Sequence, residues 1–396
     1  MSTLLASLRR EWCLLRGRSW DLAMITWVPA LALMLLVWIF SAGLPQRLPI
    51  AVWDQDHSSL SRQLTRMLEA TPGLAVQPQV LNASEAQWAL QSMSAFAVVQ
   101  IPPDFARDIK RGQSSNVALL HNAQLVTHSS LIQRDLRQVV GTMSAGIEIQ
   151  SLAKRGTPHQ VLQVRMEPVR TNLVSLFNIS TNYEQFLAAA LIPALLHVLA
   201  MTAGAWSVGR ELRDRTLGHW AREASGGRPA GWFTMLSALA GKLLLPWVSL
   251  TVCGLGALLW ITAGRGWVVP GHLEWVGLAL AALVGLSLVL GASLAALTLS
   301  LRMALSGAAL LSAPAFAFSG VGFPLLAMPD SARSWALSMP FTHYARLQVE
   351  QLLMGAPVAQ SVPILGGLTL ATIVLTVLAT TGLWRSLKRP DQWGKR

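Results

Sequence analysis

The residues best suited to chemistry lie in one short polar segment, residues 206–232 (WSVGRELRDRTLGHWAREASGGRPAGW). The segment separates two long apolar runs, and the Gly226-Gly227 pair followed by Pro229 is typical of a helix end. We expect a short charged helix lying across the membrane face. It is either a solvated loop that only fixes topology or a docking surface for a soluble partner. Its charged residues are Arg210, Glu211, Arg213, Asp214, Arg215, Arg222, Glu223 and Arg228.

Several kinds of catalytic site are excluded by their missing motifs. No GxxxxGK[ST] phosphate loop, HExxH zinc motif or GxSxG elbow occurs in the sequence. His121 and His128 have no cysteine or carboxylate partner at ligand spacing, so we interpret them as surface histidines. The chain is therefore not expected to be an enzyme, or to hold a cofactor or metal of its own.

His197 is interpreted as the ionisable residue deep in an apolar run. Polar groups inside a membrane are functional candidates, and a neutral imidazole bonded to a neighbouring helix is the milder alternative. Ion-coupled carriers usually carry a carboxylate at this depth, and none lies well away from the ends of the apolar runs. An ion-coupled carrier is therefore disfavoured, and the source of energy should lie elsewhere.

The composition indicates an integral membrane protein. The chain of 396 residues is 53% hydrophobic and 13% charged, whereas about a quarter of the residues in a soluble domain are charged. Its net charge of +12 comes mainly from arginines at the ends of apolar runs. Such arginines mark topology, so no nucleic-acid partner is expected. Two cysteines give no disulfide framework.

The hydropathy pattern predicts a polytopic α-helical membrane protein with six transmembrane helices and an inserted extracytoplasmic α/β domain. Arginines near the ends of the chain place both termini in the cytoplasm. The predicted parts are an interfacial amphipathic helix (1–20), six spans (21–44, 183–208, 232–264, 273–301, 303–326, 361–385), the α/β domain (45–182), a cytoplasmic loop (209–231), an outer re-entrant region (327–360) and a basic tail (386–396).

Sequence patterns within three of these parts support more detailed predictions. In the first helix, Leu4, Leu5, Leu8, Trp12 and Leu15 share one face, and Arg9, Arg10, Arg16 and Arg18 are predicted to face lipid headgroups. In residues 45–182, strand-like and helical patterns alternate, with a last strand at 161–169. After residue 303, we expect a span that ends early and a helix pair near 331–338 and 343–354, with an ordinary outer loop as the alternative. Breaks there include Ser319, Gly320, Gly322, Pro324 and Pro340.

Taken together, the chain resembles the membrane subunits of ABC-2 type exporters, in the branch with a large extracytoplasmic domain between spans one and two. The similar segments are VWDQDHSSLSRQLTRMLEA (52–70), IPPDFARDIKRG (101–112), the loop 209–220, SGVGFPLLAMP (319–329) and MPFTHYARLQVE (339–350). Glu211 and Thr216 match the acidic residue and the threonine of that family's loop. Arg215 and Arg213 stand where the family carries a glycine and a second acid.

The resemblance implies an export permease whose coupling helix, near residues 211–224, is seated on a separate ATP-binding subunit that carries ATP and Mg²⁺. Trp220 or Leu217 would be the buried anchor of that contact, and the N-terminal helix would also touch the subunit. The predicted sites are coupling residues (Glu211, Arg215, Thr216, Leu217, Trp220) and N-terminal contact residues (Arg9, Arg10, Trp12).

Further partners implied are a second copy or a paralogue in a dimer and the lipid of a bacterial inner membrane. The size and placement of the 45–182 domain separately suggest a periplasmic adaptor as a partner. The cargo would be hydrophobic or amphiphilic. A membrane-anchored periplasmic adaptor or scaffold without its own translocation path remains the alternative. Such a scaffold would have no use for a docking helix, and this distinguishes the two hypotheses.

Overall fold

The computed structural model describes residues 2–41, 45–77, 80–121, 126–154 and 182–394. Contacts divide the chain into two compact units, Met1–Gly43 with Ser175–Arg396, and Leu44–Val174. The strand predicted at 161–169 and the predicted end of the α/β domain lie outside the described residues.

The first unit is built of helices. Its elements are α1 (Thr3–Gly17), α2 (Ser19–Ile25), α3 (Trp27–Phe40), η1 (Glu184–Ala188), α9 (Ala189–Arg213), α10 (Leu217–Ala224), α11 (Trp232–Leu259), η2 (Trp260–Gly264), α12 (Leu273–Thr298), α13 (Leu301–Ser312), η3 (Leu325–Ala327), α14 (Asp330–Ser338), α15 (Pro340–Gln348), η4 (Val349–Met354), α16 (Val358–Ser386) and η5 (Pro390–Gln392). Segments η1, η2 and η4 are π-helical turns, whereas η3 and η5 are 3₁₀ turns.

The described residues contain five helices long and apolar enough to cross a membrane, not the six predicted. The predicted span 303–326 forms only α13, which has 12 residues. A helix of that length rises about 18 Å, which is less than a hydrocarbon core of about 30 Å. Pro314 follows the helix, and a proline cannot supply the backbone N–H that a continuing helix needs. The five crossing helices are Ser19–Phe40, Glu184–Arg213, Trp232–Gly264, Leu273–Thr298 and Val358–Ser386.

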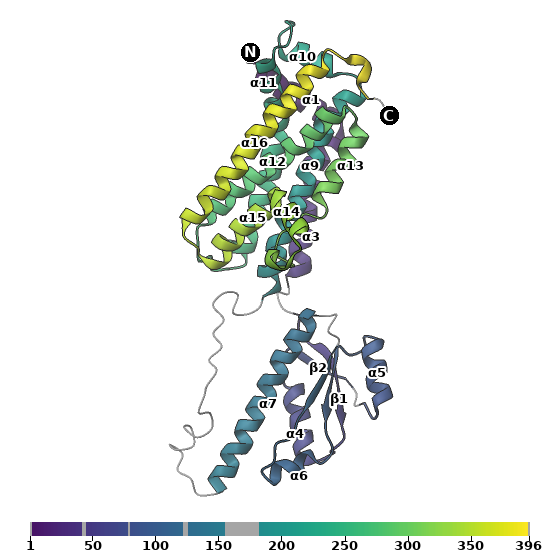
Figure 1. Cartoon of the computed structure of the whole chain (residues 1–396), viewed down its shortest axis with the longest axis vertical. Helices are drawn as coiled ribbons and strands as arrows, with labels where there is room; N and C mark the ends of the chain where they lie inside the picture. The colour runs from purple at the N-terminus through teal and green to yellow at the C-terminus, as the bar shows by residue number, and fades with distance from the viewer. Residues whose placement is uncertain (1, 42–44, 78–79, 122–125, 155–181, 395–396) are drawn as a thin grey trace. The chain divides into compact units, whose positions relative to one another are not determined.

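Helices α9 and α12 form the centre of this bundle, and their backbones nearly touch (Figure 1). A Cβ added to Gly204 of α9 would lie 1.9 Å from the carbonyl oxygen of Leu288 on α12. A Cβ added to Gly291 of α12 would lie 2.0 Å from the carbonyl oxygen of Met201 on α9. Lipid tails are as apolar as leucine, so membrane helices associate largely through such close backbone packing.

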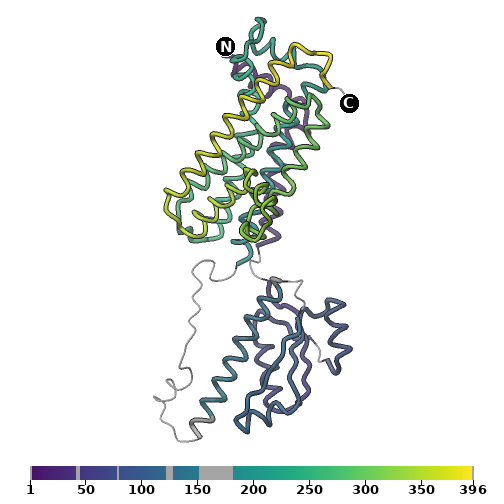
Figure 2. The backbone as a smooth tube through the Cα atoms, viewed as in Figure 1, coloured from purple at the N-terminus to yellow at the C-terminus, as the bar shows by residue number. Residues whose placement is uncertain are grey.

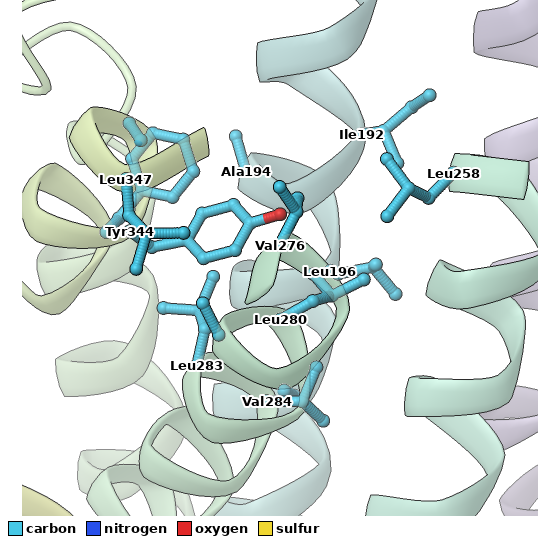
Figure 3. Packing of buried hydrophobic residues seen from close by; sticks show 14 of the residues in the cluster. Ile192, Ala194, Leu196, Leu258, Val276, Leu280, Leu283, Val284, Tyr344 and Leu347 are labelled. Carbon is cyan, nitrogen blue, oxygen red and sulfur yellow. The ribbon is translucent and has the colours of Figure 1, made fainter. Parts of the chain in front are cut away.

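At one end of the bundle, α15 closes the core against α9 and α12 (Figure 3). Tyr344 of α15 is 1% exposed and packs among Ala194 and Leu196 of α9 and Val276 and Leu280 of α12. The helix pair predicted near 331–338 and 343–354 corresponds to α14 and to α15 with η4. Pro340 is the first residue of α15, where a proline is tolerated because its missing N–H would be unpaired anyway.

The second unit contains a four-stranded sheet in the order β2-β1-β3-β4. Strand β1 pairs in parallel with β2 and β3, and β4 is antiparallel to β3. The elements are β1 (Leu48–Asp54), α4 (Ser59–Glu69), β2 (Leu74–Val76), α5 (Ala83–Gln91), β3 (Ala97–Ile101), α6 (Phe105–Lys110), β4 (Ala118–His121) and α7 (Val126–Lys154).

The alternation of side chains along β1 explains how both faces of this sheet are covered. Leu48, Ile50 and Val52 belong to the core that α4 and α7 share, whereas Ala51 and Trp53 pack with the residues of α5. Figure 1 shows α4 and α7 on one side of the sheet and α5 on the other.

Candidate functional site

Helix α10 is amphipathic, and its apolar face is buried in its own chain. Leu217, Trp220, Ala221 and Ala224 repeat at the spacing of one helix face, and all four are buried. Leu217 and Trp220, expected to anchor a partner, are each 0% exposed and fill the core of the bundle instead. The outward face carries His219, Arg222 and Glu223, all exposed, and Arg215 just before the helix is exposed as well.

Glu211 does not lie on α10. The helix predicted over 211–224 is two elements, because α9 continues to Arg213 and α10 begins at Leu217. Between them Arg215 has a φ of +59°, a left-handed conformation that costs a side chain about 1–2 kcal/mol and costs glycine nothing. Arg215 is also the position at which the similar family carries glycine.

We therefore expect Arg215→Gly to raise the stability of the chain by about 1 kcal/mol, because it relieves the left-handed strain at the corner between α9 and α10. Denaturant unfolding in detergent measures the change. The matched control is Arg222→Gly inside α10, which should lower stability by about 1 kcal/mol through helix propensity. Loss of stability in both variants would show that the corner is not strained.

Glu211 is the centre of a buried ionic cluster. Nη1 and Nη2 of Arg10, on α1, donate to the two carboxylate oxygens of Glu211 at 2.7 and 3.0 Å. Nζ of Lys242, on α11, donates to the same carboxylate at 2.8 Å. The hydroxyl of Thr216 also donates to Glu211. One carboxylate on α9 thus joins α1, α11 and the start of α10.

The cluster continues through Glu11 of α1. Lys242 Nζ donates to Glu11 at 2.8 Å, and Arg210 of α9 donates to the other oxygen of the same carboxylate. Arg210 Nη1 donates to Asp21 of α2 at 2.7 Å, and the indole N–H of Trp206 donates to Asp21 at 3.1 Å. Asp21 therefore holds α2 against α9.

The charges of this cluster balance. It contains three acids and three bases, which are Glu11, Asp21, Glu211, Arg10, Arg210 and Lys242. Burial of a single unpaired charge costs several kcal/mol, and removal of one partner from a buried pair costs about 3–5 kcal/mol. We refer to these six residues as the ionic cluster.

Trp220 links α10 directly to this cluster. Its indole N–H donates to Ser7 Oγ on α1 at 2.9 Å, and Ser7 Oγ donates to the carbonyl of Ala238 on α11 at 2.7 Å. Lys242 Nζ lies 4.6 Å from the centroid of the Trp220 ring, within the range of a cation–π contact. Helix α10 is thus seated on α1 and α11.

Two further ion pairs, each with a partly exposed partner, lie beside α10. Arg10 Nε lies 3.0 Å from Glu223, and Arg18 lies 3.4 Å from Asp214. Burial alone would lower the pKa of Arg10, but its hydrogen bond to Glu211 and the nearby acids raise it above the ordinary value. The hydrogen bond from Arg213 lowers the pKa of Asp214, and Arg18 adds to that effect.

A comparison with protein families identifies the chain. The sequence model of the family described as ABC-2 family transporter protein matches residues 20–381. The chain belongs to this ABC-2 transporter family. A search of curated proteins found no match. Membership makes the chain a membrane protein with a permease role in an ABC transporter, and it implies a partner ATP-binding subunit.

In this ABC-2 protein, the first helix is turned differently from the prediction. Its polar residues Ser7 and Glu11 are buried, and Arg10 points into the ionic cluster rather than toward headgroups. Arg9 and Trp12 are exposed, as is Leu5. The helix buries Ser7 and Glu11 together with Leu15, because the bundle offers polar and charged partners to the first two.

Sequence reasoning missed four members of the cluster, Glu11, Asp21, Arg210 and Lys242. Lys242 is the clearest case, because it is a charged residue 10 positions into the apolar helix α11 and is 0% exposed. His197 is therefore not the only ionisable group deep in a span. A lone lysine in an apolar run is itself a signal that a buried acid lies nearby.

His197 and the re-entrant residues lie apart from the ionic cluster. His197 Nδ1 is 2.7 Å from Ser287 Oγ on α12, and its ring stacks on Phe341 of α15 with centroids 6.2 Å apart. Ser319 Oγ donates to the carbonyl of Phe316 at 2.7 Å, and Gly320 has a φ of +85°. Gly322 and Pro324 follow in the same irregular segment, which ends at the 3₁₀ turn η3. Among the described residues, no group of His, Cys, Asp and Glu could hold a metal ion.

Proposed function

We propose that this chain is the permease subunit of an ATP-driven exporter, and that its ATP-binding subunit, which carries ATP and Mg²⁺, docks on the outward face of α10. The observation that carries the proposal is the division of α10 into a buried apolar face and an exposed charged one. Exposed charges at an interface set orientation and partner choice. Arg9 and Trp12 of α1 would extend the same docking surface.

The proposed topology has six crossings, one of them irregular. Gly271, before α12, adjoins Gln351, which bonds Ser361 near the start of α16, and Ala296 adjoins Gly382 near the ends of both helices. Helices α12 and α16 therefore run parallel, so the chain must return between them. We assign that return to α13 and the following turns, since irregular backbone at membrane depth is tolerated where protein or water satisfies it.

Six crossings place both termini on one side. Figure 2 shows both ends of the chain at the same end of the helical unit. Arginines on α1 and around α10 make this the cytoplasmic side under the positive-inside rule. The α/β unit would then lie on the extracytoplasmic side of a bacterial inner membrane, where it could bind a periplasmic adaptor.

The proposed cargo is hydrophobic or amphiphilic. A groove of about 590 Å³ between α3 and α11 supports this class, because its lining is mostly apolar and includes Met34, Trp38 and Trp260. A second copy or a paralogue would complete the transport path. ATP would drive the cycle by binding better to one arrangement of the two permease subunits than to the other.

The ionic cluster explains how motion of α10 would reach the spans. Glu211 and Lys242 belong to α9 and α11, and both contact groups on α1. Displacement of α10 without α1 and α11 would break the hydrogen bond from Trp220 to Ser7 and the contact between Lys242 and the Trp220 ring, which join α10 to the helices of the cluster. The three helices are expected to move as one body.

The test variant replaces exposed basic side chains of α10 with acidic ones and leaves the buried contacts of α10 with α1 and α11 unchanged. We expect the double variant His219→Glu, Arg222→Glu to weaken binding of the ATP-binding subunit at least about 10-fold, because like charges across an interface cost several kcal/mol. Co-purification in nanodiscs with candidate ATP-binding subunits, and their ATPase rate, measure the effect.

The matched control is Arg111→Glu, an exposed arginine of the α/β unit. It should bind the subunit as the unmodified chain does. Equal binding by the double variant and the control would remove α10 as the docking surface. Substitution of Glu211 or Trp220 is a poorer test, because both side chains are buried and their loss would disturb the seat itself.

A further inference from the structure

The C-terminal segment after α16 folds back into the bundle. Helix α16 ends at Ser386, and the 3₁₀ turn η5 leads to Trp393. The Trp393 side chain is buried, and its indole N–H donates to the carbonyl of Ser386 at 2.9 Å. We refer to residues 387–394 as the tail.

The tail contacts three other elements at one point. A Cβ added to Gly218 of α10 would lie 3.3 Å from Cη2 of Trp393, so the indole lies directly against that helix. The backbone N–H of Gly394 donates to the carbonyl of Leu299, at the end of α12, at 3.2 Å. A Cβ added to Gly394 would lie 3.1 Å from the carbonyl oxygen of Leu212 on α9.

Trp393 also belongs to the same buried cluster as Leu217 and Trp220 of α10. A helix of eight residues is marginal on its own and depends on packing for its position. Helix α10 is held by α1 and α11 through Trp220, and by the tail at Gly218.

We propose that the tail is a strut that fixes α10 relative to α16, with Trp393 as its positioning residue. The coupling consequence rests on the proposed function of α10: movement of α10 by an ATP-binding subunit would reach α16 through Trp393. A short turn of three residues separates α16 from the π-helical turn η4 and α15, so the strut joins the docking surface to the helices at the opposite end of the bundle.

The first test needs no partner. Hydrogen–deuterium exchange of the full chain in nanodiscs compares Trp393→Ala, Trp393→Phe and Asp391→Ala. We expect Trp393→Ala to speed exchange in α10 at least about 10-fold and to leave α12 unchanged. Trp393→Phe keeps an aromatic ring and should restore most of the protection, and the exposed Asp391 should show no effect. Unchanged exchange in α10, or an equal rise in α12, would overturn the strut.

The second test uses an ATP-binding subunit that co-purifies with the unmodified chain. Trp393→Ala should still bind that subunit, because the outward face of α10 is intact, but its ATPase rate in the complex should fall several-fold. Trp393→Phe should retain most of the rate. A rate equal to that of the unmodified complex would remove the coupling role. If no ATP-binding subunit binds the unmodified chain, the proposed function fails while hydrogen exchange still decides the strut.

Discussion

Replacement of Lys242 by methionine is expected to lower the stability of the chain by about 3–5 kcal/mol, the cost of removing one partner from a buried ion pair. Lys242 Nζ is bonded to both Glu11 and Glu211, and all three side chains are nearly inaccessible. Methionine fills a volume similar to that of lysine, so the loss of stability reflects the missing charge rather than a cavity. Denaturant unfolding in detergent gives the free energy, and faster proteolysis of α1 would show that the first helix has been released.

Two comparisons make this result specific. Lys110→Met makes the same chemical change at an exposed position and should stay within about 0.5 kcal/mol of the unmodified chain. The double variant Lys242→Met, Glu11→Gln restores the balance of buried charge and should recover about half of the loss, because the two sites are coupled. An unfolding free energy for Lys242→Met equal to that of Lys110→Met would mean that the ionic cluster does not stabilise the packing of α1, α9 and α11.

The second large effect is expected at the contact between α9 and α12. Gly204→Ala should prevent the bundle from assembling, because the new Cβ would lie 1.9 Å from a carbonyl oxygen of the facing backbone. Neither helix can yield without disturbing the centre of the molecule. We expect aggregation or loss of the monodisperse peak on size-exclusion chromatography of the detergent-extracted protein.

Gly256→Ala on α11 is the matched control. It is the same substitution within a membrane helix, and a Cβ added at Gly256 has no atom within 4 Å. This variant should elute as the unmodified chain does and gain up to about 1 kcal/mol from helix propensity. Normal elution of Gly204→Ala would show that α9 and α12 can separate without loss of the fold.

Much of the fold followed from patterns that act locally. Long apolar runs predicted five of the long helices, because a backbone in lipid must satisfy its own hydrogen bonds within a helix. The sixth run was predicted as a span because it is apolar, but Pro314 and the glycines after it stop the helix at Ser312. Hydropathy sums side-chain character and does not register a missing backbone N–H.

The sequence singled out the segment that contains α10, but it did not show which side chains of that helix are buried. The charge pattern and the family resemblance drew attention to Glu211, Leu217 and Trp220, and all three side chains are buried where α10 meets its neighbouring helices. Which face of α10 points outward depends on Arg10 of α1 and on Lys242 of α11, which lie 201 and 31 positions from Glu211 along the chain. Local periodicity carries no information about such distant partners.

By itself, the sequence determined that this is a membrane protein with a polar segment between its apolar runs, because composition and period depend only on neighbouring residues. Its similar segments also carried the resemblance to the ABC-2 family, which the family comparison shows. Only the tertiary structure decided that Glu11, Glu211 and Lys242 neutralise one another, and that Trp393 reaches α10 from the far end of the chain. A buried charge is tolerable only beside its counter-charge, and that pairing is fixed by the packing of α1, α9 and α11.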